Sequence, residues 1–348
     1  MSSQLNIFSQ IYQPYKISKD KKLRLIELFA GIGCQAKSLE RMGVDFEHYK
    51  VVEFDKYAIA SYNAIHGTNF TTMDIRDTHA SDLEIVDTDK YEYLMTYSFP
   101  CTDLSLAGNG GGMKKGSGTR SGLLWEVERI LNECDELPQV LLMENVPQVL
   151  SEKYLPDFQD WMQFLESKGY NNYYQVLNAK DYGIPQNRAR CFMVSILGDY
   201  TYEFPQPIPL KLRLKDMLED NVEEKYYLSE RMVRYITSEN DKYKVNVGGL
   251  QVNREIACAK TTREGQSRAD SSDYIVDGLP DNFNLKQQLC TDLIKKGKVK
   301  KGDMIRHSYT NHRMNQDFHI ENTENHDCSA TITTRADCLG IVVKDTRK

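Results

Sequence analysis

The chain has 348 residues, or about two domains at roughly 150 residues each. Its 40% hydrophobic and 27% charged residues exclude bulk disorder, and no stretch approaches the ~18 consecutive apolar residues of a membrane span. The net charge of -6 excludes a wholly basic nucleic-acid coat but not a local basic groove. The eight cysteines are scattered singly and residues 1–22 lack an apolar run, so we expect no disulfide framework, no secretory signal and a cytoplasmic location.

Residues 23 to about 200 read as alternating strands and helices. The predicted strands cover 23–29, 50–54, 93–97, 140–144 and 191–196, and the predicted helices cover 35–42 and 56–66. Strands that alternate with helices indicate βαβ units, and the nearly continuous apolar content of these strands is typical of burial on both faces. We therefore predict an α/β fold with a doubly wound, mostly parallel sheet. After a proline-rich linker at 202–209, the chain becomes polar with short β-like runs.

A glycine-containing turn, 29–33, connects the first predicted strand to a helix. Glycines allow close backbone approach, and the N-terminus of the helix offers N–H groups to an anion. The dinucleotide fingerprint needs a third glycine where Ala36 stands, so a carboxylate-bearing ligand such as S-adenosylmethionine fits better. Glu53 ends the next strand, where a carboxylate commonly binds ribose hydroxyls, and Asp74 could meet an adenine amino group. Taken alone, such a turn is as often structural.

Two reactive side chains follow predicted strands. Cys101 lies in a proline-shaped turn after 93–97, and Glu144 lies at the end of 140–144. Open α/β sheets bind ligands at this carboxyl edge, where a cysteine can act as a nucleophile and a carboxyl can share a proton. Each residue taken alone could instead have only a structural role, Cys101 as a buried cysteine and Glu144 as a loop carboxylate.

Two arginines precede the last predicted strand of this region. Arg188 and Arg190 lie two residues apart, so on an extended chain they face the same way. A guanidinium can hold a base carbonyl or a phosphate through two hydrogen bonds, although an isolated pair of this kind is usually solvated surface.

Taken in series, these motifs resemble the cytosine-C5 DNA methyltransferases. The similarity runs from about Leu23 to Leu197, and its pieces are 29–33, 100–101, 118–125, 144–146 and 186–190. The resemblance implies the S-adenosylmethionine-dependent methyltransferase fold with a smaller, mixed β-rich target-recognition domain. It also implies a DNA (cytosine-5-)-methyltransferase that acts on a flipped cytosine in duplex DNA as part of a restriction-modification or phage system.

The resemblance implies roles for five residues. Cys101 would attack cytosine C6, Glu144 would contact N3 and the exocyclic amine, and Arg190 would hold O2. The supporting residues would be Arg188 and Asn145, and the glycine-rich stretch 108–112 would close over the base.

The resemblance also implies the cofactor-binding residues. These are Phe29, Gly31, Ile32, Gly33, Glu53, Phe54, Asp74, Ile75, Pro100 and Leu123. The first four would surround the methionine part, Glu53 would bind the ribose and the next three would surround the adenine. Phe54 stands where the family often has tryptophan, and phenylalanine can still stack.

The chain departs from the family pattern in two places. Thr102 follows the cysteine where glutamine is frequent, and no Gly-Asn-Ser segment follows the threonine-containing signature at 329–334. We therefore expect either a truncated chain or, preferably, a second, smaller polypeptide that supplies the missing segment. The predicted division is an extension over 1–22, a catalytic and cofactor-binding domain over 23–203, and a target-recognition region over 204–348.

The target-recognition region offers only weak signals. The basic run 295–301 is a candidate phosphate contact, as are Arg306, Arg313 and Arg335. His307, His312, His319 and His326 lie near Cys328 and Cys338, but their spacing matches no standard zinc pattern, so we predict no metal.

Two alternative functions stay open at this point. A tRNA cytosine-C5 methyltransferase is disfavoured because its Cys-Phe-Thr tripeptide is absent. A catalytically inactive regulatory paralogue is disfavoured because Cys101, Glu144 and Arg190 are all present.

Overall fold

The computed structural model describes residues 13–18, 20–104, 110–219, 227, 250–259, 273–276, 283–285 and 299–301. The chain forms two compact units, one of Met1–Leu177 with Ala189–Gln206 and the other of Asn178–Arg188 with Pro207–Lys348. The functional boundary at 203/204 stays a prediction. Among the described residues, no helix combines the length and the apolar character that crossing a bilayer requires.

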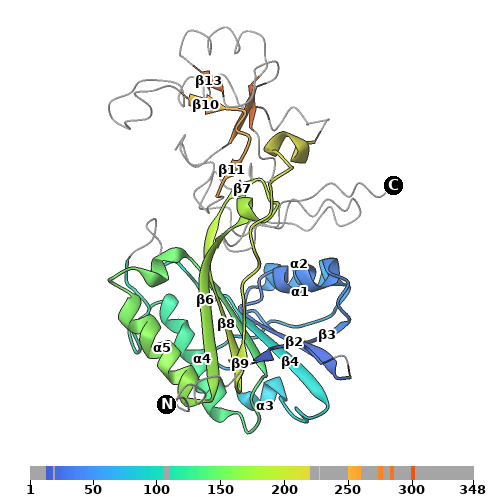
Figure 1. The fold of residues 1–348 in the computed structure, drawn as a ribbon, viewed down its shortest axis with the longest axis vertical. Helices are drawn as coiled ribbons and strands as arrows, with labels where there is room; N and C mark the ends of the chain where they lie inside the picture. Colours follow the sequence, from blue (N-terminus) through green and yellow to red (C-terminus); the bar gives the residue numbers. More distant parts are fainter. Residues whose placement is uncertain are drawn as a thin grey trace, which may run out of the picture. The chain divides into compact units, whose positions relative to one another are not determined.

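A six-stranded sheet organises the first unit (Figure 1). Its strand order is β3 (Phe46–Val52), β2 (Lys22–Leu28), β4 (Tyr91–Tyr97), β5 (Val140–Asn145), β8 (Ala189–Leu197) and β6 (Tyr170–Asn178). The first four strands pair in parallel and β8 pairs antiparallel to β5. The predicted mostly parallel sheet is confirmed.

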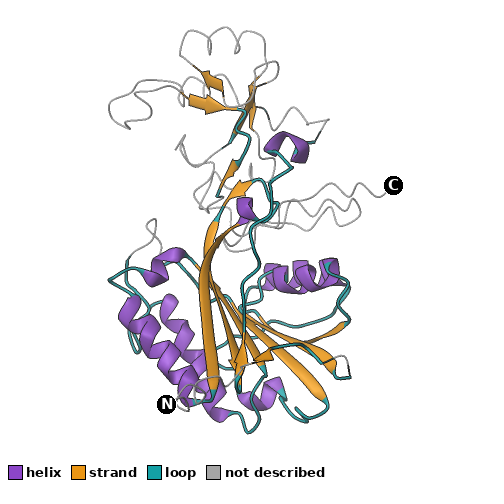
Figure 2. Ribbon diagram, in the orientation of Figure 1, coloured by secondary structure: helices purple, strands orange, loops and turns teal. Residues whose placement is uncertain are grey.

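The helices of this unit cover both faces of the sheet (Figure 2). On β2, Leu23 and Leu25 pack with helix α1 (Cys34–Arg41), whereas Ile26 and Leu28 belong to the larger cluster that contains residues of α4 and α5. Because side chains alternate along a strand, β2 contributes residues to the hydrophobic clusters on both faces of the sheet. The remaining helices are α2 (Lys56–His66), α3 (Ala80–Leu83), α4 (Leu124–Glu133) and α5 (Leu155–Ser167), with the short 3-10 helices η1 (Ser121–Leu123) and η2 (Pro147–Leu150).

Helix α2 has the predicted bounds, 56–66, because a capping residue marks each of its ends. The Asp55 side chain accepts hydrogen bonds from the backbone N–H groups of Tyr57 and Ala58, which caps the start. Gly67 ends the helix in the left-handed conformation (φ 66°).

Two edge strands differ from the sequence prediction. Strand β3 begins at Phe46 and ends at Val52, so Glu53 and Phe54 lie just beyond it rather than within it. Strand β6 was not predicted. Both are edge strands with mostly partly buried or exposed residues, and such strands lack the continuous apolar run that marks a central parallel strand.

Short β segments complete the two units. In the first, β1 (Gln13–Pro14), from the predicted extension, pairs in parallel with β9 (Tyr200–Thr201). The described parts of the second unit comprise β7 (Gln186–Asn187) with β11 (Ala257–Cys258), β10 (Leu250–Val252) with β13 (Phe283–Leu285), β12 (Tyr274–Val276) with β14 (Val299–Lys301), and the 3-10 helices η3 (Ala179–Asp181) and η4 (Leu214–Met217).

A small core of Leu214, Ala257 and Ile275 holds part of the second unit together. Most of the predicted DNA contacts lie outside the described residues, namely residues 295–298, Arg306, Arg313 and Arg335. The clustered histidines with Cys328 and Cys338, for which we predict no metal, lie outside them too. Of the predicted closing stretch 108–112, only 110–112 is described.

Candidate active site

Strands β4 and β5 bring the predicted catalytic turn and the predicted catalytic carboxylate to one edge. The two strands pair in parallel, with Tyr97 opposite Met143. This register places the turn at Phe99–Cys101, which follows β4, next to the end of β5. The buried Asn145 joins them, because its Nδ2 donates to the Phe99 carbonyl oxygen at 3.0 Å. Its Oδ1 accepts from the Val146 N–H at 2.8 Å, so both ends of the amide are used. Asn145 therefore holds the backbone two residues before Cys101.

Ser121 holds the same turn from the other side. Its Oγ donates to the Pro100 carbonyl oxygen at 2.6 Å and accepts from the Asp103 N–H at 3.2 Å. The Ser121 N–H donates in return to Asp103 Oδ2 at 3.2 Å. Cys101 itself is partly buried. Ser121 and Asp103 were not predicted as site residues, although Ser121 lies inside the 118–125 segment that carries part of the resemblance.

Glu144 and Arg190 form an ion pair. Arg190 Nε lies 2.8 Å from Glu144 Oε1, and the two side chains are only 13% and 12% exposed. Glu144 pairs with Phe192 across the antiparallel β5–β8 ladder, so Arg190 is its diagonal neighbour on the same face. Arg190 Nη1 also donates to the Ala189 carbonyl oxygen at 2.8 Å, which fixes the guanidinium. A carboxyl and a guanidinium held together in this way can present a proton and N–H donors to one planar heterocycle.

Arg188 belongs to the other compact unit. It is buried, and its backbone is fastened there: its N–H donates to Asn178 Oδ1 at 3.0 Å and its carbonyl oxygen accepts from the Ala179 N–H at 3.0 Å.

The glycine turn after β2 depends on an unusual backbone. Phe29, Gly31 and Gly33 all have positive φ angles, of 57°, 59° and 80°. A Cβ at Gly33 would lie 2.4 Å from His66 Nε2 and 2.5 Å from Tyr62 Cε2, so this position requires glycine for space as well as for conformation.

A buried carboxylate holds the glycine turn in place. Glu53 Oε2 accepts from the Gly31 N–H at 3.0 Å, and its Oε1 accepts from the Asp55 N–H at 2.9 Å. Its backbone oxygen accepts from the Met73 N–H at 2.9 Å, which links this carboxylate to the next predicted cofactor segment.

The other predicted cofactor residues divide into exposed and anchored ones. Phe54 is 58% exposed, although Glu53 beside it is buried. Asp74 is hydrogen-bonded by Arg76, and this bond lowers the pKa of the Asp74 carboxyl below its usual value. Ile75 is buried in the main core, and Leu123 packs against that core from the end of η1.

These observations agree with comparisons to known proteins. Residues 23–336 match the family model described as C-5 cytosine-specific DNA methylase. The chain belongs to this family. It is therefore a DNA (cytosine-5-)-methyltransferase with S-adenosylmethionine as methyl donor, and the predicted family and activity are confirmed.

Individual relatives cover most of the chain. It is 34% identical over 320 residues to the orphan methyltransferase M.SssI of Spiroplasma monobiae, which spans 75% of this chain and 78% of that protein. It is also 34% identical over 260 residues to the type II methyltransferase M2.ScrFI of Lactococcus lactis subsp. cremoris, spanning 61% and 71%. Among solved structures, the Entamoeba histolytica methyltransferase EhMeth has a similar fold, with a TM-score of 0.67, 16% identity and coverage of 93% and 96%.

The residues around the glycine turn are chemically suited to S-adenosylmethionine. Gly31 and Gly33 carry no side chain, so a bound ligand can approach the backbone of this left-handed turn closely. The buried Glu53 is a fixed acceptor suited to ribose hydroxyls, and the exposed Phe54 ring offers a face on which an adenine can stack.

Proposed function

We propose that this methyltransferase modifies cytosine in a specific duplex DNA site with Cys101 as the nucleophile, Glu144 as the proton-sharing acid and Arg190 as the holder of cytosine O2. The observation that carries this assignment is the Glu144–Arg190 pair, 2.8 Å apart at the end of β5. That strand is the parallel neighbour of the strand leading to Cys101. A nucleophile, an acid and a cation thus come from three adjacent strands of one sheet.

The chemistry needs each of these groups. Cytosine C5 is a poor nucleophile, so the Cys101 thiolate first forms a bond to C6 and the ring electrons move toward C5 and N3. Glu144 donates a proton to N3 as negative charge develops, and Arg190 donates hydrogen bonds to O2. S-Adenosylmethionine supplies the methyl group to C5. Loss of the C5 proton then expels the thiolate and restores the C5–C6 double bond.

Asn145 and Ser121 act as positioning residues in this proposal. Both bind backbone carbonyl oxygens of the Phe99–Pro100 segment, so both set the direction in which Cys101 leaves the strand. A shift of about 1 Å at a reacting atom is sufficient to lower a rate by roughly two orders of magnitude. C6 is inaccessible inside a stacked duplex, so the target cytosine must flip out of the helix to reach Cys101.

The cofactor site of the proposal comprises the ten predicted residues. Phe29, Gly31, Ile32 and Gly33 line the methionine part, Glu53 binds the ribose, and Phe54, Asp74 and Ile75 surround the adenine. Pro100 and Leu123 complete the pocket.

The biological setting that we infer is a restriction-modification or phage system. Several relatives carry the name type II methyltransferase, and another is an orphan methyltransferase of Bacillus phage SPbeta. The reactive thiol must stay reduced, which favours the cytoplasm. The second, smaller polypeptide stays a prediction, and its test is the turnover of the isolated 348-residue chain: full activity without any addition contradicts it.

The experiment that tests the catalytic assignment is covalent trapping. The target site is first read by bisulfite sequencing of unmethylated DNA treated with the enzyme. A duplex with 5-fluorocytosine at that site should then form an adduct in the presence of S-adenosylmethionine, because fluorine cannot leave C5 as a proton does.

Two cysteine variants make this test specific. Cys101→Ser should form no adduct, whereas Cys134→Ser should form as much as the parent chain. Cys134 is a suitable control because burial raises the pKa of its thiol to about 11, which keeps the thiol unreactive. An adduct in Cys101→Ser, or equal loss in both variants, contradicts the assignment. No adduct in the parent chain with any partner added favours an inactive regulatory protein instead.

A further inference from the structure

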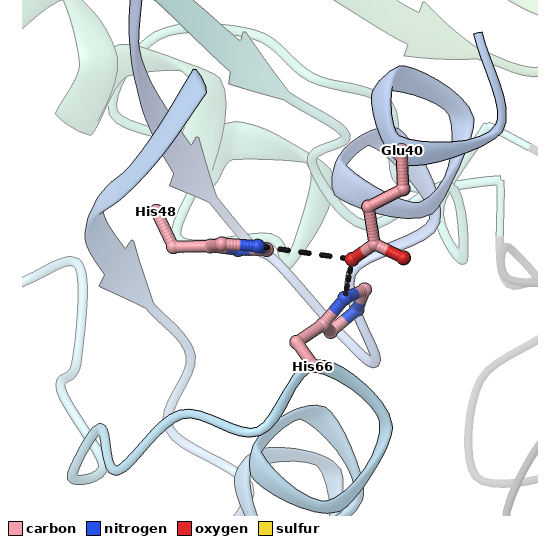
Figure 3. A group of neighbouring side chains, drawn as sticks. All are labelled: Glu40, His48 and His66. Carbon is pink, nitrogen blue, oxygen red and sulfur yellow. Dashed lines mark hydrogen bonds and ion pairs between the residues drawn. The ribbon is translucent and has the colours of Figure 1, made fainter. Parts of the chain in front are cut away.

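Three side chains outside the catalytic edge converge on one point (Figure 3). They are Glu40 of α1, His48 of β3 and His66 of α2, and their ligand atoms all lie within 4.8 Å of one another. Glu40 Oε1 lies 2.6 Å from His66 Nδ1 and 3.7 Å from His48 Nε2. The His66 side chain is fully buried.

The contact behind His66 determines which of its ring nitrogens is left to face Glu40. Its Nε2 lies 3.1 Å from the Ile32 carbonyl oxygen, which can only accept, so Nε2 carries a proton. The other nitrogen, Nδ1, faces Glu40 Oε1 at 2.6 Å, where it donates a hydrogen bond when protonated and can act as a metal ligand when it is not.

His48 is arranged in the same way through a longer chain. The Tyr62 hydroxyl donates to Glu27 Oε2 at 2.6 Å, so its oxygen accepts from His48 Nδ1 at 2.8 Å. The lone pair of His48 Nε2 therefore faces Glu40 as well. A proton on His66 Nδ1 can join His66 to Glu40 at their distance of 2.6 Å, and a divalent cation can replace that proton, because His66 Nδ1, His48 Nε2 and Glu40 Oε1 all face one point.

We propose that Glu40, His48 and His66 bind one divalent transition-metal ion of the Zn²⁺ class at a site separate from the catalytic one. Two imidazoles and one carboxylate are a donor set suited to Zn²⁺, and three protein ligands leave a fourth position for water. This proposal departs from the sequence prediction of no metal, because the residues have no spacing that a zinc pattern would recognise.

The local geometry allows the ion to enter with a small movement. Zn–N bonds of about 2.0–2.1 Å place tetrahedral donor atoms roughly 3.3 Å apart, so the Glu40 carboxylate must retreat slightly from His66. Glu40 is partly exposed, and its other oxygen is held by Lys37 Nζ at 2.7 Å, so one oxygen is directed to the ion.

The outer contacts match those of protein metal sites. Ligating histidines generally donate their second N–H to a carbonyl or, directly or through another group, to a carboxylate. His66 donates to Ile32 of the glycine turn, and His48 reaches Glu27 through Tyr62. A bound ion would tie α1, β3 and α2 together and fasten the turn that we assign to the cofactor.

A Zn²⁺ titration of the full chain by calorimetry tests this site. Because other histidines and cysteines in the chain can also take up zinc, the readout is the difference in tightly bound ions between the parent chain and its variants. Glu40→Gln and His48→Gln should each bind one ion fewer, through an affinity loss of at least about 100-fold. Tyr62→Phe, which keeps all three ligands, should bind about 10- to 100-fold more weakly.

His79→Gln is the matched control, because exposed His79 pairs with Glu133 elsewhere on the surface. It should retain the full number of ions. Thermal unfolding without metal checks that each variant folds, and Co²⁺ in place of Zn²⁺ should give a tetrahedral visible spectrum that is lost in Glu40→Gln. An equal number of ions in the parent chain, Glu40→Gln and His48→Gln overturns the proposal, and so does an equal loss in His79→Gln.

Discussion

Two turns that follow neighbouring parallel strands differ in what they require of the sequence. The glycine turn after β2, which the Glu53 carboxylate also holds, has three positive φ angles in five residues and no room for a Cβ at Gly33. The cysteine turn after β4 depends on side chains from elsewhere, with Asn145 and Ser121 bound to its carbonyl oxygens. The first turn is therefore sensitive to added atoms, and the second is sensitive to removed ones.

The largest expected effect belongs to the chemistry beside the cysteine turn. Glu144→Gln removes the proton that N3 requires but keeps the size of the side chain, so kcat should fall by about 10²- to 10⁴-fold. Single-turnover methylation of the mapped site measures this loss. Glu126→Gln, which removes a partly exposed carboxylate bonded to Arg129, is the control and should keep kcat. A parent-like kcat in Glu144→Gln removes this residue from the mechanism.

The glycine turn should break when one carbon is added. Gly33→Ala places a methyl group against His66 and Tyr62 at a positive φ, and we expect a loss of about 2–4 kcal/mol in the free energy of unfolding. Urea unfolding measures it. Gly43→Ala is the matched control, because Gly43 also has a positive φ but nothing lies within 4 Å of its added Cβ. It should lose only about 1–2 kcal/mol. Equal losses would mean that backbone conformation alone, not space, requires glycine at 33.

The start of α1, just after the glycine turn, should be sensitive to pH. Burial raises the pKa of Glu27 to about 7 from the usual 4.5, and the Ala36 N–H donates to this carboxyl. Between about pH 4.5 and 7 the folded chain keeps a proton that the unfolded chain loses, so the stability from this group falls as pH rises. The total contribution lost is about 3 kcal/mol.

Glu27→Gln tests this dependence because it mimics the protonated carboxyl at every pH. Urea unfolding at pH 5 and pH 8 should show a smaller decline in stability for the variant than for the parent chain. Identical pH profiles for the two proteins would show that Glu27 titrates normally in the folded state.

The cysteine turn should weaken when a bonding atom is removed. Ser121→Ala leaves the Pro100 carbonyl oxygen and the Asp103 N–H without their partner, and we expect a loss of about 1–2 kcal/mol in stability. The rate of adduct formation at Cys101 should fall as well, which a purely structural role would not require. Ser117→Ala, on the exposed surface, should change neither quantity, and a parent-like adduct rate in Ser121→Ala would limit this serine to stability.

Central strands and well-capped helices were readable from the sequence. A parallel strand buried on both faces is an apolar run, as in β4 and β5, and helix α2 is bounded by Asp55 and Gly67. Edge strand β6 was missed because its tyrosines and asparagines are half exposed and form no run. The burial of Glu27 was also not predicted. Its position as a carboxylate within the apolar stretch 23–29 could have indicated that it is buried and that its pKa is shifted.

The sequence by itself determined the family, the alternation of strands and helices, and the motif residues, because these follow from short local patterns. Only the tertiary structure decided that Arg190 and Glu144 form an ion pair, that Ser121 fastens the cysteine turn, and that Glu40, His48 and His66 share one point. These contacts join side chains from different strands and helices, and the distance between such side chains is set by strand order and helix packing rather than by their spacing along the chain.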